Sequence, residues 1–239
     1  MKNKRKFWFR CYKGFIKLFK KPTNFKYVGD KITSPSLIIS NHVGTKAPLS
    51  FELYLDEKIR FWGTHEMNSG LKNMYRYQTR VFYHEKRGWN LHLARLYCLL
   101  ASPLTYIFYK GLNLISTYKD GRFIKTIKES FNAVNEGNSI IIFPEVSDKG
   151  YLDELEGLHN GFIMFADYAY RKGIDLPIVV TYYHKKSNVH IIDNPLNYSQ
   201  LLNKYKTYDE IAKALLKRCN ELFKELQFTY EESLKEISK

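Results

Sequence analysis

The sequence predicts a single α/β domain in which helices cover a mixed, largely parallel sheet. Short apolar segments alternate with longer amphipathic segments along the chain, which is the pattern of strands that alternate with helices. The 239 residues match one domain of ordinary size, and no obvious internal repeat divides them. Hydrophobic residues make up 44% of the chain, which is enough for a substantial core.

Residues 1–24 are expected to form a basic, aromatic, amphipathic helix that contacts a membrane, ahead of the main domain at residues 25–239. Lysines and arginines occupy much of one side, and Pro22 ends the helix. Such a helix suits a membrane interface, with rings among the head groups and cations near anionic lipid. The alternative is a helix that packs on the protein's own core. The apolar side chains at helical spacing are Trp8, Tyr12, Phe15, Ile16 and Phe19.

The main domain alternates predicted strands and helices in chain order. Short apolar runs predict the strands, and helical spacing with end signals predicts the helices. A long amphipathic helix is expected in the C-terminal segment, where apolar residues recur at helical spacing. The predicted strands are 36–40, 59–63, 112–115, 139–143, 176–182 and 189–192, and the shorter helices are 48–55, 122–135 and 161–171.

Residues 91–114 are the most apolar stretch of the chain. Their charge-free core, residues 96–109, is shorter than the roughly 20 residues that span a bilayer as a helix. Pro103 is expected to interrupt the stretch as well. We therefore predict a buried or interfacial helical element here.

The formal net charge of +14 points to an anionic partner: a membrane surface, a nucleic acid, or an acidic protein or cofactor. A composition rich in lysine accounts for part of this excess. The three cysteines are far apart, and the histidines and acidic residues form no ligand cluster, so no metal is expected. The basic N-terminal segment has no secretory signal pattern, and a reduced, intracellular protein is the simplest expectation.

Chemically capable residues follow two of the predicted strands. Asn41 and His42 come directly after the strand at 36–40, where a histidine can accept a proton from a hydroxyl near neutral pH. Taken alone, a histidine in this place is more often structural. The segment Phe143-Pro144-Glu145 ends the strand at 139–143, and its carboxylate can hold a donor or orient a cation.

Two cations, Lys119 and Arg122, lie at the start of the predicted helix at 122–135. Beside the free N–H groups of a helix start, two cations can hold a phosphate. The alternative is an ordinary solvated turn.

In this order and spacing, these segments resemble the four-block pattern of the glycerolipid acyltransferases, the lysophosphatidic acid acyltransferase family. Asn41-His42 resembles the first block, in which four residues and an Asp follow Asn-His. The strand that ends near Lys119 is similar to the second block, and Phe143-Pro144-Glu145 to the third, Phe-Pro-Glu-Gly. The fourth, an apolar strand with proline, is similar to residues 176–180, and residues 157–162 also look like the family. The resemblance covers roughly residues 25–183.

The resemblance implies a glycerol-3-phosphate acyltransferase-like fold. It implies transfer of a fatty acyl group from acyl-CoA or acyl-carrier protein to a hydroxyl of a lysophospholipid such as lysophosphatidic acid. His42 would be the general base, with no cofactor beyond the acyl donor, and no nucleic-acid partner is expected. The implied location is the cytoplasmic face of the cell membrane, as a peripheral or monotopic protein. The implied substrate-binding residues are Asn41, Gly44, Lys119, Arg122, Phe143, Pro144 and Glu145.

Three positions depart from the family pattern. Ala47 stands where the family's Asp would orient His42, Val146 replaces the last Gly of the third block, and Lys119 replaces an Arg. Glu52, on the next predicted helix, is the nearest carboxylate in sequence and the candidate for the missing catalytic role.

The loss of the Asp leaves a catalytically inactive lipid-binding relative as an alternative. A nucleic-acid-binding protein is a further alternative that rests on charge and aromatic content. No helix-turn-helix, zinc-finger or RNA-recognition signature accompanies that charge.

Overall fold

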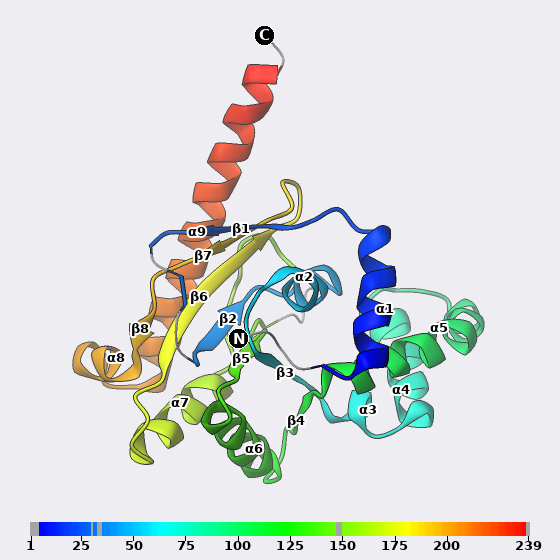
Figure 1. Ribbon diagram of the computed structural model, residues 1–239, viewed down its shortest axis with the longest axis horizontal. Coiled ribbons are helices and arrows are strands. Elements are labelled where there is room, and N and C mark those ends of the chain that lie inside the picture. The colour runs from blue at the N-terminus through cyan, green and yellow to red at the C-terminus, as the bar shows by residue number, and fades with distance from the viewer. Residues whose placement is uncertain (1–4, 30, 33–34, 147–149, 238–239) are drawn as a thin grey trace.

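The computed structural model describes residues 5–29, 31–32, 35–146 and 150–237. Within them, eight strands form one sheet in the order β1-β7-β6-β2-β5-β3-β4, and β8 pairs with β6 (Figure 1). Pairing is parallel except for the two partners β7 and β8 on β6, which confirms a mixed, largely parallel sheet. The strands are β1 (Asn24–Tyr27), β2 (Leu37–Ser40), β3 (Ile59–Thr64), β4 (Ile115–Thr117), β5 (Ser139–Ile142), β6 (Pro177–His184), β7 (Val189–Ile192) and β8 (Leu196–Asn197).

Strand β2 lies at the centre of the sheet, between β5 and β6 and parallel to both. All four of its residues are buried, as expected for a strand covered on both faces. Because side chains alternate along a strand, Leu37 and Ile39 face one apolar core and Ile38 faces the other. Since β2 and β5 run in the same direction, the residues that follow them meet at one edge of the sheet.

Helices cover both faces of this sheet (Figure 1). The core that contains Leu37 and Ile39 is closed by α6, α7, α8 and α9, and the core that contains Ile38 is closed by α1, α2 and the end of α5. The helices are α1 (Phe7–Leu18), α2 (Lys46–Tyr54), α3 (His65–Asn68), α4 (Leu71–Tyr77), α5 (Leu91–Leu112), α6 (Phe123–Asn135), α7 (Gly161–Arg171), α8 (Tyr198–Lys204) and α9 (Tyr208–Ile237), with the π-helix η1 (Gln78–Glu85) between α4 and α5.

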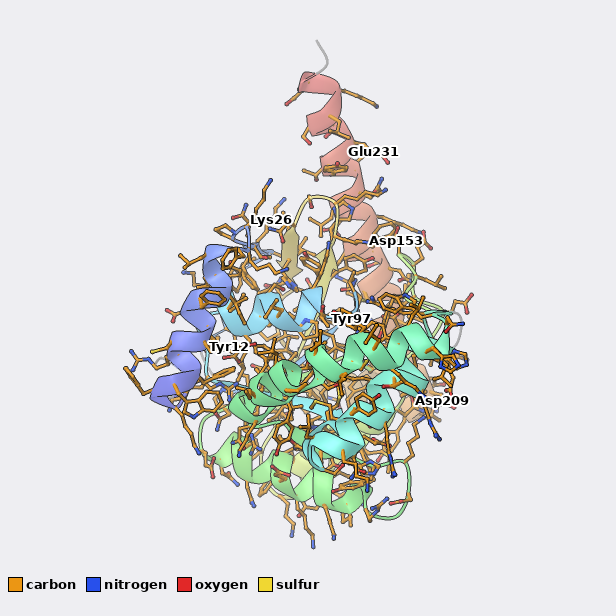
Figure 2. All side chains as sticks on the ribbon, turned by 90° about the vertical axis from the view of Figure 1, so that its right-hand side faces the viewer. Tyr12, Lys26, Tyr97, Asp153, Asp209 and Glu231 are labelled. Atoms are coloured by element: carbon orange, nitrogen blue, oxygen red, sulfur yellow. The ribbon has the colours of Figure 1, made fainter. Side chains whose placement is uncertain are left out.

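Helix α1 lies against α5 on one side of the molecule (Figures 1 and 2). Phe9 is fully buried there and packs on Phe108, with ring centroids 5.5 Å apart. Gly111 leaves the space that the Phe9 ring fills, and a Cβ atom at that position would overlap the ring. One face of α1 therefore packs on the protein's own core, which was the alternative to membrane contact in the sequence analysis. Other side chains of α1 remain exposed.

Pro103 does not interrupt the apolar stretch, contrary to the sequence-based expectation. Residues Leu91–Leu112 form one helix of 22 residues with Pro103 inside it. A proline removes one backbone hydrogen bond, and the remaining turns continue the helix on both sides. Contacts with η1, α4, α3 and α1 support it.

Candidate active site

The residues after β2 and β5 meet at the carboxyl edge of the sheet, because the two strands are parallel neighbours. The backbone N–H of His42 donates to the Glu145 carboxylate, with N and Oε2 2.8 Å apart. Glu145 is buried, and burial raises its pKa to about 7, although the backbone hydrogen bonds from His42 and Leu152 and the charge of Lys86 act in the other direction. The first and third sequence blocks are thus joined by a direct hydrogen bond.

Asn41 connects the loop that carries His42 to the neighbouring strand β6. Its side-chain amide donates to the carbonyl of Tyr183 at 3.1 Å, and its side-chain oxygen accepts the N–H of Tyr183 at 2.7 Å. Asn41 is almost completely buried. The amide is occupied within the fold, so the structure favours a positioning role for Asn41 over the substrate contact that we expected.

The imidazole of His42 packs between two aromatic rings. The Tyr151 ring is stacked on it at 4.8 Å between centroids, and the Phe143 ring meets it edge-on at 5.0 Å. Burial lowers the pKa of His42 to about 4, the interaction of the ring with its own backbone acts in the other direction, and the charge of Lys86 lowers the pKa further. His42 is therefore a neutral imidazole at pH 7, the form that can accept a proton.

One ring nitrogen of His42 is left without a partner. Nδ1 is buried, and within the described residues no group forms a hydrogen bond with it. Ala47 lies in the first turn of α2 and is completely buried. A methyl group cannot accept a hydrogen bond from Nδ1–H, so nothing at position 47 fixes the tautomer or balances the charge of an imidazolium.

Glu52 does not take the place of the missing Asp, contrary to our expectation. Its carboxylate binds Arg5, with Nη2 and Oε2 2.7 Å apart, and Lys13, with Nζ and Oε1 2.7 Å apart. Arg5 also donates to the carbonyls of Leu112 and Ile59. The fully buried carboxylate thus joins the N-terminal segment to α2. The described residues show no hydrogen bond between Glu52 and His42.

Replacing Glu52 with glutamine is expected to lower the free energy of unfolding by about 3–5 kcal/mol, because two cations keep their buried positions without a counter-charge. The pair Arg60–Glu129 supplies the control: Glu129 is 45% exposed, and Glu129→Gln is expected to cost at most about 1 kcal/mol. Urea unfolding of both variants measures the difference. Equal, small losses would show that the N-terminal segment does not depend on Glu52.

Lys119 and Arg122 lie at the β4 edge of the sheet, whereas His42 follows the central strand β2. They follow β4, and strands β5 and β3 separate β4 from β2. Arg122 donates to the Asp120 carboxylate, with Nη2 and Oδ2 2.7 Å apart, and this contact lowers the pKa of Asp120 to about 2. Lys119 is exposed. The structure brings these two cations to one turn but gives them no contact with the His42 loop.

The remaining predicted residues lie around His42. Phe143 also stacks on Phe61 at 6.5 Å between centroids, and the carbonyl of Pro144 accepts the N–H of His159 at 2.7 Å. Glu145 forms a β-bridge with Leu158, so the segment at 157–162 packs on the third block. Gly44 has a φ of +58°, a left-handed conformation that favours glycine.

Three residues at this site were not predicted from the sequence: Tyr151, Lys86 and Arg87. Tyr151 comes from the segment after the third block, and burial raises its pKa to about 12. Lys86 and Arg87 come from the turn between η1 and α5. Neither belongs to a block of the resemblance, and no spacing in the sequence connects them to His42.

Across the residues that the structure describes, no group of three His, Cys, Asp or Glu side chains is arranged to hold a metal ion. The expectation of metal-free chemistry remains a prediction.

Comparison with known proteins supports the fold. No protein-family model and no curated protein sequence matches the chain. Among solved structures, the chain is similar to the crystal structure of the 1-acyl-sn-glycerophosphate (LPA) acyltransferase PlsC from Thermotoga maritima. The TM-score is 0.51 at 11% sequence identity, and the match covers 91% of this chain and 79% of that chain. At this identity, the likeness establishes that the chain has an α/β fold similar to that of an LPA acyltransferase.

Proposed function

We propose that this chain is an acyltransferase that moves a fatty acyl group from acyl-CoA or acyl-carrier protein to a hydroxyl of a lysophospholipid such as lysophosphatidic acid. The observation that carries the proposal is the neutral His42 after the central strand, tied by its backbone to the carboxylate of Glu145. The fold supports it, because the similar solved structure is an LPA acyltransferase.

In the proposed reaction, His42 accepts the proton of the acceptor hydroxyl while the hydroxyl oxygen attacks the thioester carbonyl. The carbon–sulfur bond then breaks, the thiolate leaves, and the imidazolium of His42 returns the proton to sulfur. Backbone N–H groups near Val43 and Gly44 would stabilise the developing oxyanion. The acyl group passes directly to the acceptor, so no acyl-enzyme forms.

The second candidate is a lipid-binding relative without catalytic activity. Two observations favour it: among the described residues the buried Nδ1 of His42 has no hydrogen-bond partner, and position 47 carries a buried alanine. In a serine-protease triad, disturbing the carboxylate partner of the histidine lowers kcat by about 10⁴-fold. A comparable loss here would leave binding intact and turnover negligible.

One experiment separates the two candidates. The purified protein is incubated with labelled acyl-CoA or acyl-carrier protein and with lysophosphatidic acid, other lysophospholipids or glycerol 3-phosphate. Binding of the same lipids is measured in parallel. Product formation from a phosphate-bearing acceptor supports the enzyme, and binding without product supports the inactive relative. If neither binding nor product is observed, both candidates are refuted.

We also propose that α5 and α1 form the surface that meets the membrane. By length and composition, α5 is the described helix that is long and apolar enough to cross a bilayer. It packs on the protein through Ala94, Cys98 and Ser102, so we place it along the membrane surface rather than across it. Its exposed apolar side chains are Leu93, Leu96, Leu99, Leu100, Leu104 and Ile107.

Helix α1 adds aromatic groups and cations beside α5 (Figure 2). Phe7, Phe15 and Phe19 are at least 60% exposed, and the exposed cations of the same segment suit anionic head groups. Deleting the whole segment would be a poor test, because Arg5 and Lys13 hold the buried Glu52. Point substitutions on the exposed faces leave that anchor in place.

The double variant Leu96→Gln/Leu100→Gln is expected to weaken binding to anionic vesicles by at least about tenfold. The reason is that each substitution removes the favourable free energy of transferring a leucine side chain from water into the membrane. These side chains are 66% and 75% exposed, so folding should be unaffected. The matched control is Phe228→Gln/Leu234→Gln on the exposed side of α9. Vesicle co-sedimentation measures both, and added salt should weaken binding of the unchanged protein by screening. Equal binding by the α5 variant and the control would place the membrane contact elsewhere.

A further inference from the structure

The turn between η1 and α5 brings two cations to the His42 loop. It carries Lys86 and Arg87, which lie more than forty positions after His42 in the chain. A Cβ atom built on Gly44 would lie 3.5 Å from Nη2 of Arg87, so the guanidinium stands directly over this loop. The charge of Arg87 also acts on Tyr151, the residue whose ring is stacked on His42.

The backbone of this turn is fixed by hydrogen bonds. The N–H of Lys86 donates to the carbonyl of Val81 at 2.9 Å, and the N–H of Trp89 donates to the carbonyl of Tyr83 at 2.9 Å. Asn90 then caps α5, because its side-chain oxygen accepts the N–H of His92 at 2.8 Å. A fixed backbone lowers the entropic cost of presenting the two cations to a ligand.

The guanidinium of Arg87 lies over two aromatic rings of η1. Its Cζ lies 4.7 Å from the centroid of the Phe82 ring and 5.6 Å from that of Tyr83. Cation–π contacts use the positive charge and not the N–H donors, which suit the oxygens of a phosphate. In the described part of the chain, neither Arg87 nor Lys86 forms an ion pair with a carboxylate.

Lys86 occupies the neighbouring position of the same turn. Its charge acts on both His42 and Glu145, the two residues that join the first and third blocks. The side chains of Lys86 and Arg87 are exposed, so a ligand can reach them. By contrast, Arg122 is already neutralised by Asp120.

We propose that Arg87 and Lys86 bind the phosphate of the acceptor lipid and hold its hydroxyl at His42. The inference rests on the proposed acyl transfer and adds a phosphate site outside the four blocks. Arg87 supplies the planar donor group that Lys119, in the second block, lacks.

The position of the two cations favours the acceptor over the donor. In lysophosphatidic acid, only a few bonds separate the free hydroxyl from the phosphorus. In acyl-CoA, the whole pantetheine arm separates the thioester from the nearest phosphate. A cation directly over the histidine loop is therefore placed for a phosphate that accompanies the attacking hydroxyl.

The kinetic test compares Arg87→Ala with Arg95→Ala, which removes an exposed arginine from the neighbouring helix α5. Arg87→Ala is expected to raise KM for short-chain lysophosphatidic acid about tenfold or more, because a charged hydrogen bond is lost. KM for acyl-CoA and the rate with the matching neutral monoacylglycerol should stay unchanged. Arg87→Lys should recover part of the loss. An equal change for the phosphate-bearing and neutral acceptors would overturn the proposal.

A binding test separates this inference from the proposed reaction. Calorimetry with glycerol 3-phosphate, glycerol and coenzyme A needs no turnover. Loss of glycerol 3-phosphate affinity in Arg87→Ala, with Arg95→Ala unchanged, supports the phosphate site even if no acyl transfer is found. Unchanged glycerol 3-phosphate affinity, or a loss confined to coenzyme A, overturns it whatever the reaction is.

Discussion

Replacing His42 with alanine is expected to lower the rate of acyl transfer by about 10²- to 10⁴-fold, the usual contribution of a positioned general base. The reason is that His42 is the neutral base at the carboxyl edge of the sheet, with Glu145 holding its backbone. Steady-state turnover with lysophosphatidic acid measures the loss. Lipid affinity should change far less, because the imidazole acts on the hydroxyl proton and not on the phosphate.

Two control variants test whether the loss of rate comes from the imidazole and not from disturbed packing. The ring of His42 packs on Tyr151 and Phe143, so His42→Gln, which keeps more of the side-chain volume, should show the same loss of rate. His159→Ala changes an exposed histidine near the third block and should leave the rate unaltered. A full rate in either His42 variant would remove His42 from the chemistry.

The strands that carry the central site were predictable from the sequence, whereas their order in the sheet was not. Short apolar runs fixed β2 and β5, and parallel neighbours end at the same edge of a sheet. The resemblance to the four-block pattern placed His42 and Glu145 in one site, and the parallel pairing of β2 with β5 brings them together although they are more than a hundred positions apart. The hydrogen bond between them adds a detail that no sequence pattern carries, because the donor is a backbone N–H.

The predicted catalytic role of Glu52 was wrong, and helical geometry explains why. Residues five positions apart on a helix differ in direction by about 140°, so position 52 cannot share the face of position 47. Ala47 lies at the start of α2 near the His42 loop, whereas Glu52 turns toward Arg5 and Lys13. Nearness in sequence was a poor guide to nearness in space.

The environment of α5 and the turn before it could not be predicted from composition. A stretch that is apolar on most sides gives no preferred face, and only its packing partners decide which leucines stay exposed. The approach of Arg87 to Gly44 depends on the π-helix η1 and on the turn that follows it. Periodicity in the sequence indicates neither of them.

Replacing Ala47 with aspartate is expected to raise the acyl-transfer rate by about 10²- to 10⁴-fold, because it supplies the charged partner that the histidine lacks. Position 47 is in the first turn of α2, and the buried Nδ1 of His42 has no hydrogen-bond partner among the residues that the structure describes. A carboxylate there would accept a hydrogen bond from Nδ1–H, fix the tautomer and balance the imidazolium that forms during proton transfer. Inserting a larger side chain at this buried position should cost about 1–3 kcal/mol of stability.

The same substitution leads to a second prediction, which concerns the pH dependence of activity. His42 works as a base only when it is neutral, so activity falls as the pH drops through its pKa. In the unchanged protein, burial lowers that pKa to about 4, and the acid limb of kcat/KM should lie near that pH. An aspartate at position 47 favours the charged imidazole, so the pKa rises and the acid limb moves to higher pH.

Ala47→Asn is the matched control, because asparagine offers a similar shape and a hydrogen-bond acceptor without the charge. It should fix the tautomer and raise the rate in part, but leave the acid limb near its original pH. An aspartate variant that folds, shows an unshifted limb and gains no rate would mean that His42 does not need a carboxylate. Orientation would then have to come from the Tyr151 and Phe143 rings that already enclose the imidazole.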